Sequence, residues 1–311
     1  GEEGATFLGY WLLLDAVEAN PTASYARPVL DDRLSSLPYG ARLRAEDASR
    51  TPELLRAVLE EIGLKPHELA RHQAMITAPA FQADLGESAF LPAGLEAQQW
   101  AFDAALVRAV AHPDVPELKA ALQADARIAS HYLGRDQPTT GRKMALRLVA
   151  YLAEARAAAK PSPTPDYQAG LDLAEHYRRD GGFVDWARRH LRSISVGPHV
   201  DAFQTVLAEV DRLRREQDQR FQGYVSWVAH GKPSTQVLPI EAVTKKVVAE
   251  LLKAEPRRKL LVILMDGMSM SDLVQLLESA ETEPDRWSPA AWRPKGFEGL
   301  EAGLLPPVLA S

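Results

Sequence analysis

The run Lys259-Leu260-Leu261-Val262-Ile263-Leu264-Met265-Asp266-Gly267-Met268-Ser269 lies close to the end of this 311-residue chain. Six apolar residues follow one another in it, and two of them are β-branched. Such a run is typical of a strand that is covered on both faces, as in a parallel α/β sheet. The strand is expected to end at Asp266 and Gly267.

A helix is predicted directly after this strand. Ser269 and Asp272 have the spacing of a capping box, which marks a helix start. Asp266 would then lie at the C-terminal rim of a sheet, where open α/β folds bind ligands, and Gly267 would allow a sharp turn. A carboxylate held there suits a metal ion. Two other interpretations stay open: Asp266 ends the strand and caps the helix, or it belongs to a Walker B strand of a nucleotide hydrolase.

The composition excludes several classes of protein. The net charge of −6 gives no support to general nucleic-acid affinity, although direct binding through a local patch stays open. The absence of cysteine excludes disulfides, thiolate catalysis and cysteine-rich zinc sites, and it fits a reducing compartment, so we expect a cytoplasmic protein. No apolar stretch approaches the roughly 18 residues of a membrane span, so no membrane association is expected.

Both ends of the chain suggest an excised fragment. The N-terminal Gly-Glu-Glu-Gly lacks an initiator Met and has no basic region of a signal peptide. The C-terminal segment 304–311 stops among apolar residues. One strand and one helix cannot complete an α/β sheet, so we expect the fold that begins near residue 259 to be unfinished here.

The region before the strand is predicted to be helical throughout, so the expected fold class is mainly α, followed by the incomplete start of an α/β domain. Residues 21–50 are expected to be irregular, because Pro28, Pro38 and Gly40 interrupt them. Three prolines within 161–165 form a stiff extended break. The predicted domains are a helical domain over 1–160, a second helical segment over 161–256 and the truncated α/β start over 257–311. Helices are expected over 7–19, 51–62, from 65, over 95–111, 116–133, 140–159, 166–179, 182–192, 199–229 and 239–254, whereas 79–92 is expected to be a loop with a single helical turn.

Other signals favour structural roles. The histidines show no His-Glu-x-x-His spacing for zinc, so we expect surface or capping histidines. The loop 134–143 lacks the spacing of a Walker A loop. Six aromatic residues at core spacing are interpreted as packing groups: Trp11, Trp100, Trp186, Trp227, Tyr151 and Tyr224. Arg178, Arg179, Arg188, Arg189 and Arg192 form a basic patch that is interpreted as a solvated face, with a partner or nucleic-acid surface as the alternative.

Taken together, the run from Lys259 to Ser269 resembles the opening of a PglZ domain. The PglZ family belongs to the alkaline phosphatase superfamily and occurs in BREX phage-defence systems, where a long, mostly helical region precedes a phosphatase-like domain. That domain begins with a strand ending in Asp-Gly or Asp-Ala, and this chain has a similar order. The similarity in motif covers about 259–275, with support from the Leu-Pro segment near 304–309. The same strand opens other members of the superfamily, including cofactor-independent phosphoglycerate mutases.

The resemblance implies a role for a single residue of this chain. In the superfamily the first Asp binds one of two divalent metals, and only Asp266 takes that position. The nucleophilic Ser or Thr and the later Asp and His ligands would follow Ser311, and Ser311 itself is not assigned. Because two metals clamp the attacking and leaving oxygens, one carboxylate cannot perform the reaction. We therefore expect Zn, Mn or Mg in the intact parent, none in this fragment, and no activity of the fragment alone.

The sequence thus predicts the N-terminal region of a PglZ-like phage-defence protein. Its helical part would contact other components of a defence complex, and its parent would hydrolyse a phosphoester or phosphodiester. The alternatives are a non-catalytic helical adaptor in which Asp266 is a helix cap, and a fragment of a nucleotide hydrolase with a Walker B strand.

Overall fold

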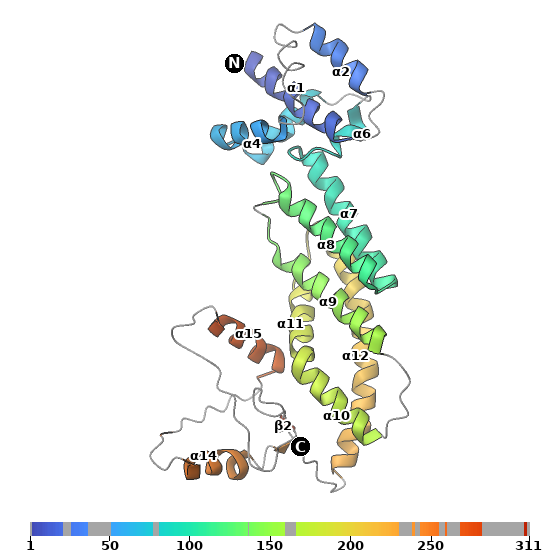
Figure 1. Ribbon diagram of the computed structural model, residues 1–311, viewed down its shortest axis with the longest axis vertical. Coiled ribbons are helices and arrows are strands. Elements are labelled where there is room, and N and C mark those ends of the chain that lie inside the picture. The colour runs from blue at the N-terminus through green and yellow to red at the C-terminus, as the bar shows by residue number, and fades with distance from the viewer. Residues whose placement is uncertain are drawn as a thin grey trace. The chain divides into compact units, whose positions relative to one another are not determined.

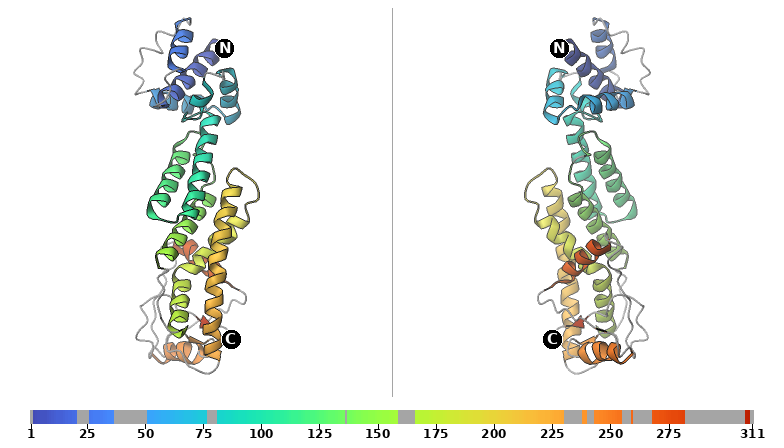
Figure 2. Two further views of the ribbon diagram at one scale, coloured as in Figure 1. Left: turned by 90° about the vertical axis from the view of Figure 1, so that its right-hand side faces the viewer. Right: turned by 90° about the vertical axis from the view of Figure 1, so that its left-hand side faces the viewer.

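The computed structural model describes residues 2–20, 26–36, 51–76, 81–135, 137–158, 166–229, 238–239, 243–254, 259, 268–281 and 308–309. Helices dominate these residues (Figure 1, Figure 2), which confirms the mainly α class. The chain divides into two compact units: Gly1–Ala150 with Ser195–Phe203, and Tyr151–Ile194 with Gln204–Ser311. The predicted domain limits at 160/161 and 256/257 stay a prediction. Among the described helices, none has the length and apolar character to span a membrane.

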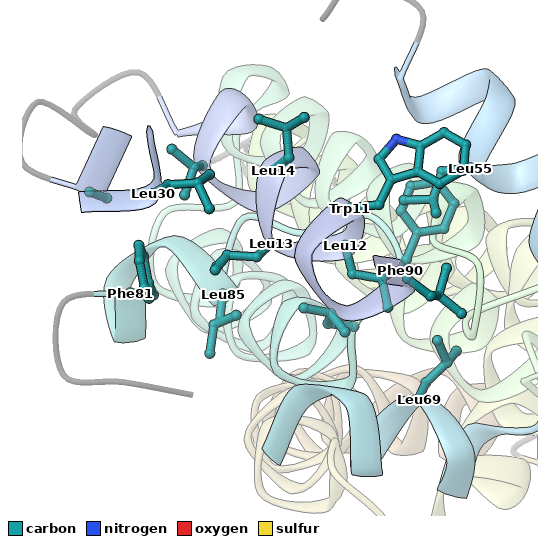
Figure 3. Close-up of a cluster of buried hydrophobic side chains, with 14 of the residues drawn as sticks. Trp11, Leu12, Leu13, Leu14, Leu30, Leu55, Leu69, Phe81, Leu85 and Phe90 are labelled. Carbon is teal, nitrogen blue, oxygen red and sulfur yellow. The ribbon is translucent and has the colours of Figure 1, made fainter. Parts of the chain in front are cut away.

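The first unit is built around helix α1 (Glu2–Ala19). Its other helices are α2 (Ala26–Ser35), α4 (Thr51–Ile62), α5 (Pro66–Ile76), α6 (Gln82–Leu85), α7 (Pro92–Ala111), α8 (Val115–Ser130) and the first part of α9 (Thr140–Ala158). Leucines 12, 13 and 14 of α1 are buried on neighbouring faces, because α2, α4, α5 and α6 all contact this helix. Figure 3 shows α1 enclosed by apolar side chains from these elements, among them Leu30, Leu55, Leu69 and Phe81. The helix predicted over 7–19 is confirmed.

Several helix ends lie where local chemistry places them. Helix α4 starts at Thr51-Pro52, as a proline in the first turn favours. It ends before Gly63, whose φ of 67° is the left-handed conformation of a glycine cap. Helix α6 supplies the single turn expected within 79–92. These ends were predictable because each depends on neighbouring residues alone.

Helix α2 contradicts the prediction that 21–50 is irregular. It spans Ala26–Ser35 and buries Ala26, Leu30 and Leu34. Pro28 does not prevent it, because the N–H groups of a first helical turn have no partner within the helix and their loss costs little. Residues 37–50, with Pro38 and Gly40, lie outside the described residues.

Helix α7 turns Trp100 away from the core, although the sequence predicted it to be a packing group. Trp100 is 70% exposed, and Val107 is 41% exposed. The buried side is formed by Phe102, Ala105, Leu106 and Ala109. Helix α8 is the main neighbour of α7 and determines this orientation. Trp100 is therefore not a core residue, whereas Trp11, Tyr151 and Tyr224 are buried as predicted.

The second unit contains the rest of α9 and most of α12 (Val200–Ala229), together with four shorter helical elements and two π-helical turns. These are α10 (Asp166–His176), the π-helical turn η3 (Tyr177–Gly181), α11 (Gly182–Arg192), the π-helical turn η4 (Thr244–Val248), α14 (Ala249–Ala254) and α15 (Met270–Glu281). Two short strands, β1 (Leu238–Pro239) and β2 (Val308–Leu309), pair in parallel. The helices predicted over 166–179, 182–192 and 199–229 are confirmed, with η3 joining the first two. Pro239, the predicted start of the last helix, lies in β1 instead, and the next described residues, from Val243, are helical.

The contact between α10 and α12 depends on a missing side chain. A Cβ atom at Gly170 would lie 2.3 Å from Cβ and Cγ of the buried Tyr224. Gly223, one residue earlier in α12, has no atom within 4 Å of its Cβ position. Alanine substitutions at Gly170 and at Gly223 therefore compare a crowded helix position with an open one.

Gly170→Ala is expected to lower the free energy of unfolding by about 1–3 kcal/mol, because the added methyl group overpacks the helix pair. Gly223→Ala is expected to raise it by up to about 1 kcal/mol, the normal gain in helix propensity. Urea denaturation followed by circular dichroism measures both. Equal effects of the two substitutions would contradict the close approach of α10 and α12.

Candidate functional site

The predicted strand 260–265 and the proposed metal ligand Asp266, with Gly267, lie outside the described residues. The structure describes the chain again from Met268, at the start of α15. Ser269 donates its backbone N–H to Asp272 Oδ2 at 3.0 Å, and the Asp272 backbone N–H donates to Ser269 Oγ at 3.3 Å. These reciprocal bonds confirm the predicted capping box. Because Ser269 fills the cap position, α15 does not depend on Asp266 for capping.

Helix α11 binds the cap of α15 through Arg189. Its Nη1 atom lies 2.7 Å from Asp272 Oδ1, while the other carboxylate oxygen accepts a 2.6 Å bond from Ser269 Oγ. Hydrogen bonds from Ser269 and then from Arg189 lower the pKa of Asp272 to about 2. Asp272 therefore remains ionised and tied to α11 throughout the physiological pH range.

The two helices also meet through a glycine. A Cβ atom at Gly182, the first residue of α11, would lie 2.5 Å from Met270 Cγ and 3.1 Å from Val274 Cγ2. Only glycine leaves room for this approach without displacing Met270. Gly182 and Arg189 thus attach the first turn of α15 to the helices of the second unit.

The predicted basic patch is largely neutralised by acidic neighbours. Arg188 Nη1 binds Asp185 Oδ1 at 2.6 Å, and Arg188 Nη2 binds Asp211 Oδ1 at 2.6 Å. Arg192 binds the second oxygen of Asp211, also at 2.6 Å. Partial burial would raise the pKa of Asp211, but hydrogen bonds from Arg192 and Arg188 outweigh it and hold that pKa below its ordinary value.

These arginines therefore join α11 to α12 and α15. Arg188, with a side chain only 18% exposed, does not belong to a solvated face. The side chains of Arg178 and Arg179 lie outside the described residues. A free cationic surface for nucleic acid is not present among the arginine side chains that the structure describes on α11.

The π-helical turn η3 carries a polar group that the sequence did not reveal. Tyr177 donates its hydroxyl to Asp185 Oδ2 at 3.0 Å, and the Arg214 guanidinium lies 4.9 Å from the centre of the Tyr177 ring. Burial, with the neighbouring Asp185 carboxylate, raises the pKa of Tyr177 to about 12. Tyr177 is therefore a neutral hydrogen-bond donor at physiological pH. Periodicity could not reveal it, because Arg214 is distant in sequence.

Asp15, Ser88 and His131 form a second polar cluster in the first unit. Ser88 Oγ lies 3.5 Å from Asp15 Oδ2, and it accepts the backbone N–H groups of Phe90 and Leu91 at 3.2 and 3.1 Å. Asp15, Ser88 and His131 are only 4%, 0% and 1% exposed. These residue types occur in hydrolytic triads, but a substrate cannot reach them here, and the Ser88 hydroxyl instead stabilises the turn before α7.

His199 precedes α12 and pairs with Asp103. Its Nδ1 lies 2.7 Å from Asp103 Oδ1, and the centre of its ring lies 5.2 Å from that of Phe102 and 5.7 Å from that of Phe203. Its carbonyl accepts the Phe203 N–H at 2.9 Å, so His199 occupies the N-terminal cap position of α12. Across the described part of the chain, no three or more His, Asp or Glu side chains gather where they could hold a metal.

Comparison with known proteins identifies no relative. No protein-family model matches the chain, no curated protein shows significant sequence similarity to it, and no solved structure shows a significant structural match.

Proposed function

We propose that this chain is the N-terminal region of a PglZ-like phage-defence protein. Its helices would bind other components of the defence complex, and its C-terminal part would begin a metal-dependent phosphatase or phosphodiesterase domain. In that domain Asp266 would be the first ligand of a divalent cation such as Zn, Mn or Mg. The nucleophile and the other ligands would come from residues that follow Ser311.

The capping box of α15 carries this proposal. The motif resemblance predicts a strand, then Asp-Gly, then a helix, and the described helix begins at Met270, four residues after Asp266. Ser269 and Asp272 satisfy the helix start between them. This supports the cation role over the adaptor alternative, because that alternative requires Asp266 to serve as the cap. The parallel pairing of β1 with β2 also agrees with the start of an α/β sheet.

The 311-residue chain is expected to show no turnover of p-nitrophenyl phosphate or bis(p-nitrophenyl) phosphate with Mn²⁺, Zn²⁺ or Mg²⁺. The described residues gather no metal-binding group, and a single carboxylate cannot clamp both reacting oxygens. Release of nitrophenol measures this directly. Turnover by the chain that disappears on Asp266→Ala would show that the fragment is itself an enzyme.

A longer polypeptide that continues past Ser311 tests the proposal itself. Turnover of either ester is expected, and Asp266→Ala should abolish it. Asp272→Asn is the matched control, because it weakens the helix cap by about 1 kcal/mol and leaves the proposed ligand in place. If the longer protein binds metal-free nucleotide in calorimetry and hydrolyses no ester, the nucleotide-hydrolase alternative replaces this one. If it does neither, the adaptor alternative stands.

A further inference from the structure

The segment before the predicted strand concentrates positive charge. From Lys245 to Lys259 the sequence has six basic residues and two acidic ones, although the whole chain has a net charge of −6. Among the described residues of this segment, Lys245, Lys246, Lys253 and Lys259 are all exposed. A local surplus of this kind attracts polyanions even on an acidic protein, because salt limits the reach of distant charges to about 10 Å at 0.1 M.

The lysines of η4 and α14 lie on one side of a continuous helical segment. Ala249 joins the two elements with helical dihedral angles. Lys253 follows Lys245 and Lys246 by eight and seven residues, which is about two helical turns. Val247 follows Lys245 by two residues, close to half a turn, and is only 6% exposed. The segment therefore buries one side and turns its lysines to solvent.

Lys253 has one acidic neighbour on this surface. Its Nζ atom lies 3.0 Å from Glu250 Oε1, and the two side chains are 72% and 40% exposed. Such an exposed pair is weak and sensitive to salt. The ammonium group can therefore exchange the Glu250 carboxylate for a phosphate group at little cost.

We propose that this lysine surface, formed by Lys245, Lys246 and Lys253, binds the phosphate backbone of double-stranded DNA. A duplex carries one negative charge for about every 1.7 Å of its axis, and lysines on a helix neutralise such phosphates without reading the bases. The choice of a phosphodiester polymer rests on the proposed function, because the domain that begins after Lys259 would act on phosphoesters or phosphodiesters.

Two other polyanions fit the same surface less well. A helix that lies on an anionic membrane needs a free apolar side, whereas Val247 on the apolar side of this segment is buried. Single-stranded nucleic acid is held largely by stacking on aromatic side chains, and residues 244–254 include no aromatic residue. A duplex requires only the positive charges that the segment presents.

Fluorescence anisotropy of a labelled 20-base-pair duplex, titrated with the 311-residue chain between 50 and 200 mM salt, tests the proposal. The dissociation constant is expected to be about 10 μM or lower at 50 mM salt. The logarithm of the affinity should fall with the logarithm of the salt concentration with a slope of about −3 or steeper, because at least three phosphates are neutralised.

The triple variant Lys245→Gln/Lys246→Gln/Lys253→Gln should weaken binding at 50 mM salt by at least about 10-fold. It should also make the salt slope shallower by about 3, since each lost phosphate contact removes about 1. The matched control is Lys65→Gln/Lys119→Gln/Lys143→Gln, which removes the same charge at exposed positions of the first unit and should leave affinity and slope nearly unchanged. Circular dichroism melting establishes that both variants are folded.

Three results would overturn the proposal. Equal weakening by the two triple variants would mean that overall charge, and not this surface, attracts the duplex. Binding to phosphatidylserine vesicles without binding to the duplex would assign the surface to a membrane. Displacement of the duplex by an equal charge concentration of polyglutamate would assign it to an acidic protein.

This test is independent of the test of the proposed function, because it measures binding alone. A longer polypeptide that hydrolyses no ester, together with a chain that binds the duplex through its lysines, would reject only the phosphatase assignment. Ester hydrolysis without duplex binding would reject only the lysine surface.

Discussion

Asp125→Ala is expected to lower the free energy of unfolding of the first unit by about 3–5 kcal/mol, the cost of leaving a buried charge without its partner. Arg142 is among the most deeply buried large side chains, and it is 2% exposed. Its Nε binds Asp125 Oδ1 at 2.5 Å. Arg142 also lies in the first turn of α9, where the helix dipole disfavours a positive charge. Asp125 therefore supplies most of the compensation for that charge.

Two further variants separate the ion pair from simple packing. Glu60→Ala removes the partner of Arg135 in a pair whose side chains are 45% and 52% exposed, and such a pair contributes about 1 kcal/mol or less. The double variant Asp125→Ala/Arg142→Met should recover much of the loss, because no buried charge remains. Urea denaturation of all four proteins gives the comparison. A loss for Asp125→Ala no larger than that for Glu60→Ala would mean that water reaches Arg142.

The second large expected effect concerns the buried residues Asp15 and His131. Their contributions to the pH dependence of the unfolding free energy have opposite signs and cancel in the parent chain. Burial raises the pKa of Asp15 to about 6, from 3.8, and burial lowers the pKa of His131 to about 4, from 6.5. Between pH 4 and pH 6 the folded chain holds its proton on Asp15 and the unfolded chain holds it on His131. Both states then bind the same number of protons at these two sites, so the two sites together give no slope of stability with pH.

Replacing either residue is expected to reveal the pH dependence of stability that the remaining residue causes. In Asp15→Asn only His131 remains, and its lowered pKa makes the unfolding free energy fall as pH falls from 6.5 towards 4. In His131→Gln only Asp15 remains, and its raised pKa makes the unfolding free energy fall as pH rises from 3.8 towards 6. Either slope should approach about 1.4 kcal/mol per pH unit, a total of about 3 kcal/mol.

Denaturation midpoints of the parent, both single variants and the double variant at half-unit pH steps measure these slopes. Taking each variant relative to the parent removes the contribution of carboxylates elsewhere, such as Asp211 and Asp272. The double variant should again match the parent in slope. Arg56 lies near both groups and opposes protonation at each, so Arg56→Met should raise both pKa values together. Parallel slopes for the two single variants would exclude the compensation.

The sequence predicted the parts of this fold that depend on neighbouring residues. The start of α4 at Thr51-Pro52, its end before Gly63 and the capping box of Ser269 with Asp272 are all set within four residues. The helix limits near 166, 192 and 199 follow from the same local signals. The capping box is the part of the candidate site that the structure describes. The metal-binding role of Asp266 stays a prediction from the motif.

What the sequence did not predict depends on residues far apart in the chain. Asp15 and Ser88 are separated by 73 residues, and no periodic pattern links such positions. Helix α7 carries apolar or small residues on most sides, so periodicity could not choose between Trp100 and Phe102 for the core. Helix α8 makes that choice by packing on one side. Pro28 lies in the first turn of α2, where a proline is tolerated although it breaks a helix further along.

The π-helical turn at Tyr177–Gly181 sets the rotation of α11, the helix that follows it directly. A π turn holds one residue more than an α turn, and each residue of an α-helix advances the direction of a side chain by about 100°. Deletion of one residue from this turn would rotate α11 about its axis, and Gly182 and Arg189 would then face away from α15. The extra residue therefore determines which face of α11 meets α15, the helix that follows Asp266 in the sequence.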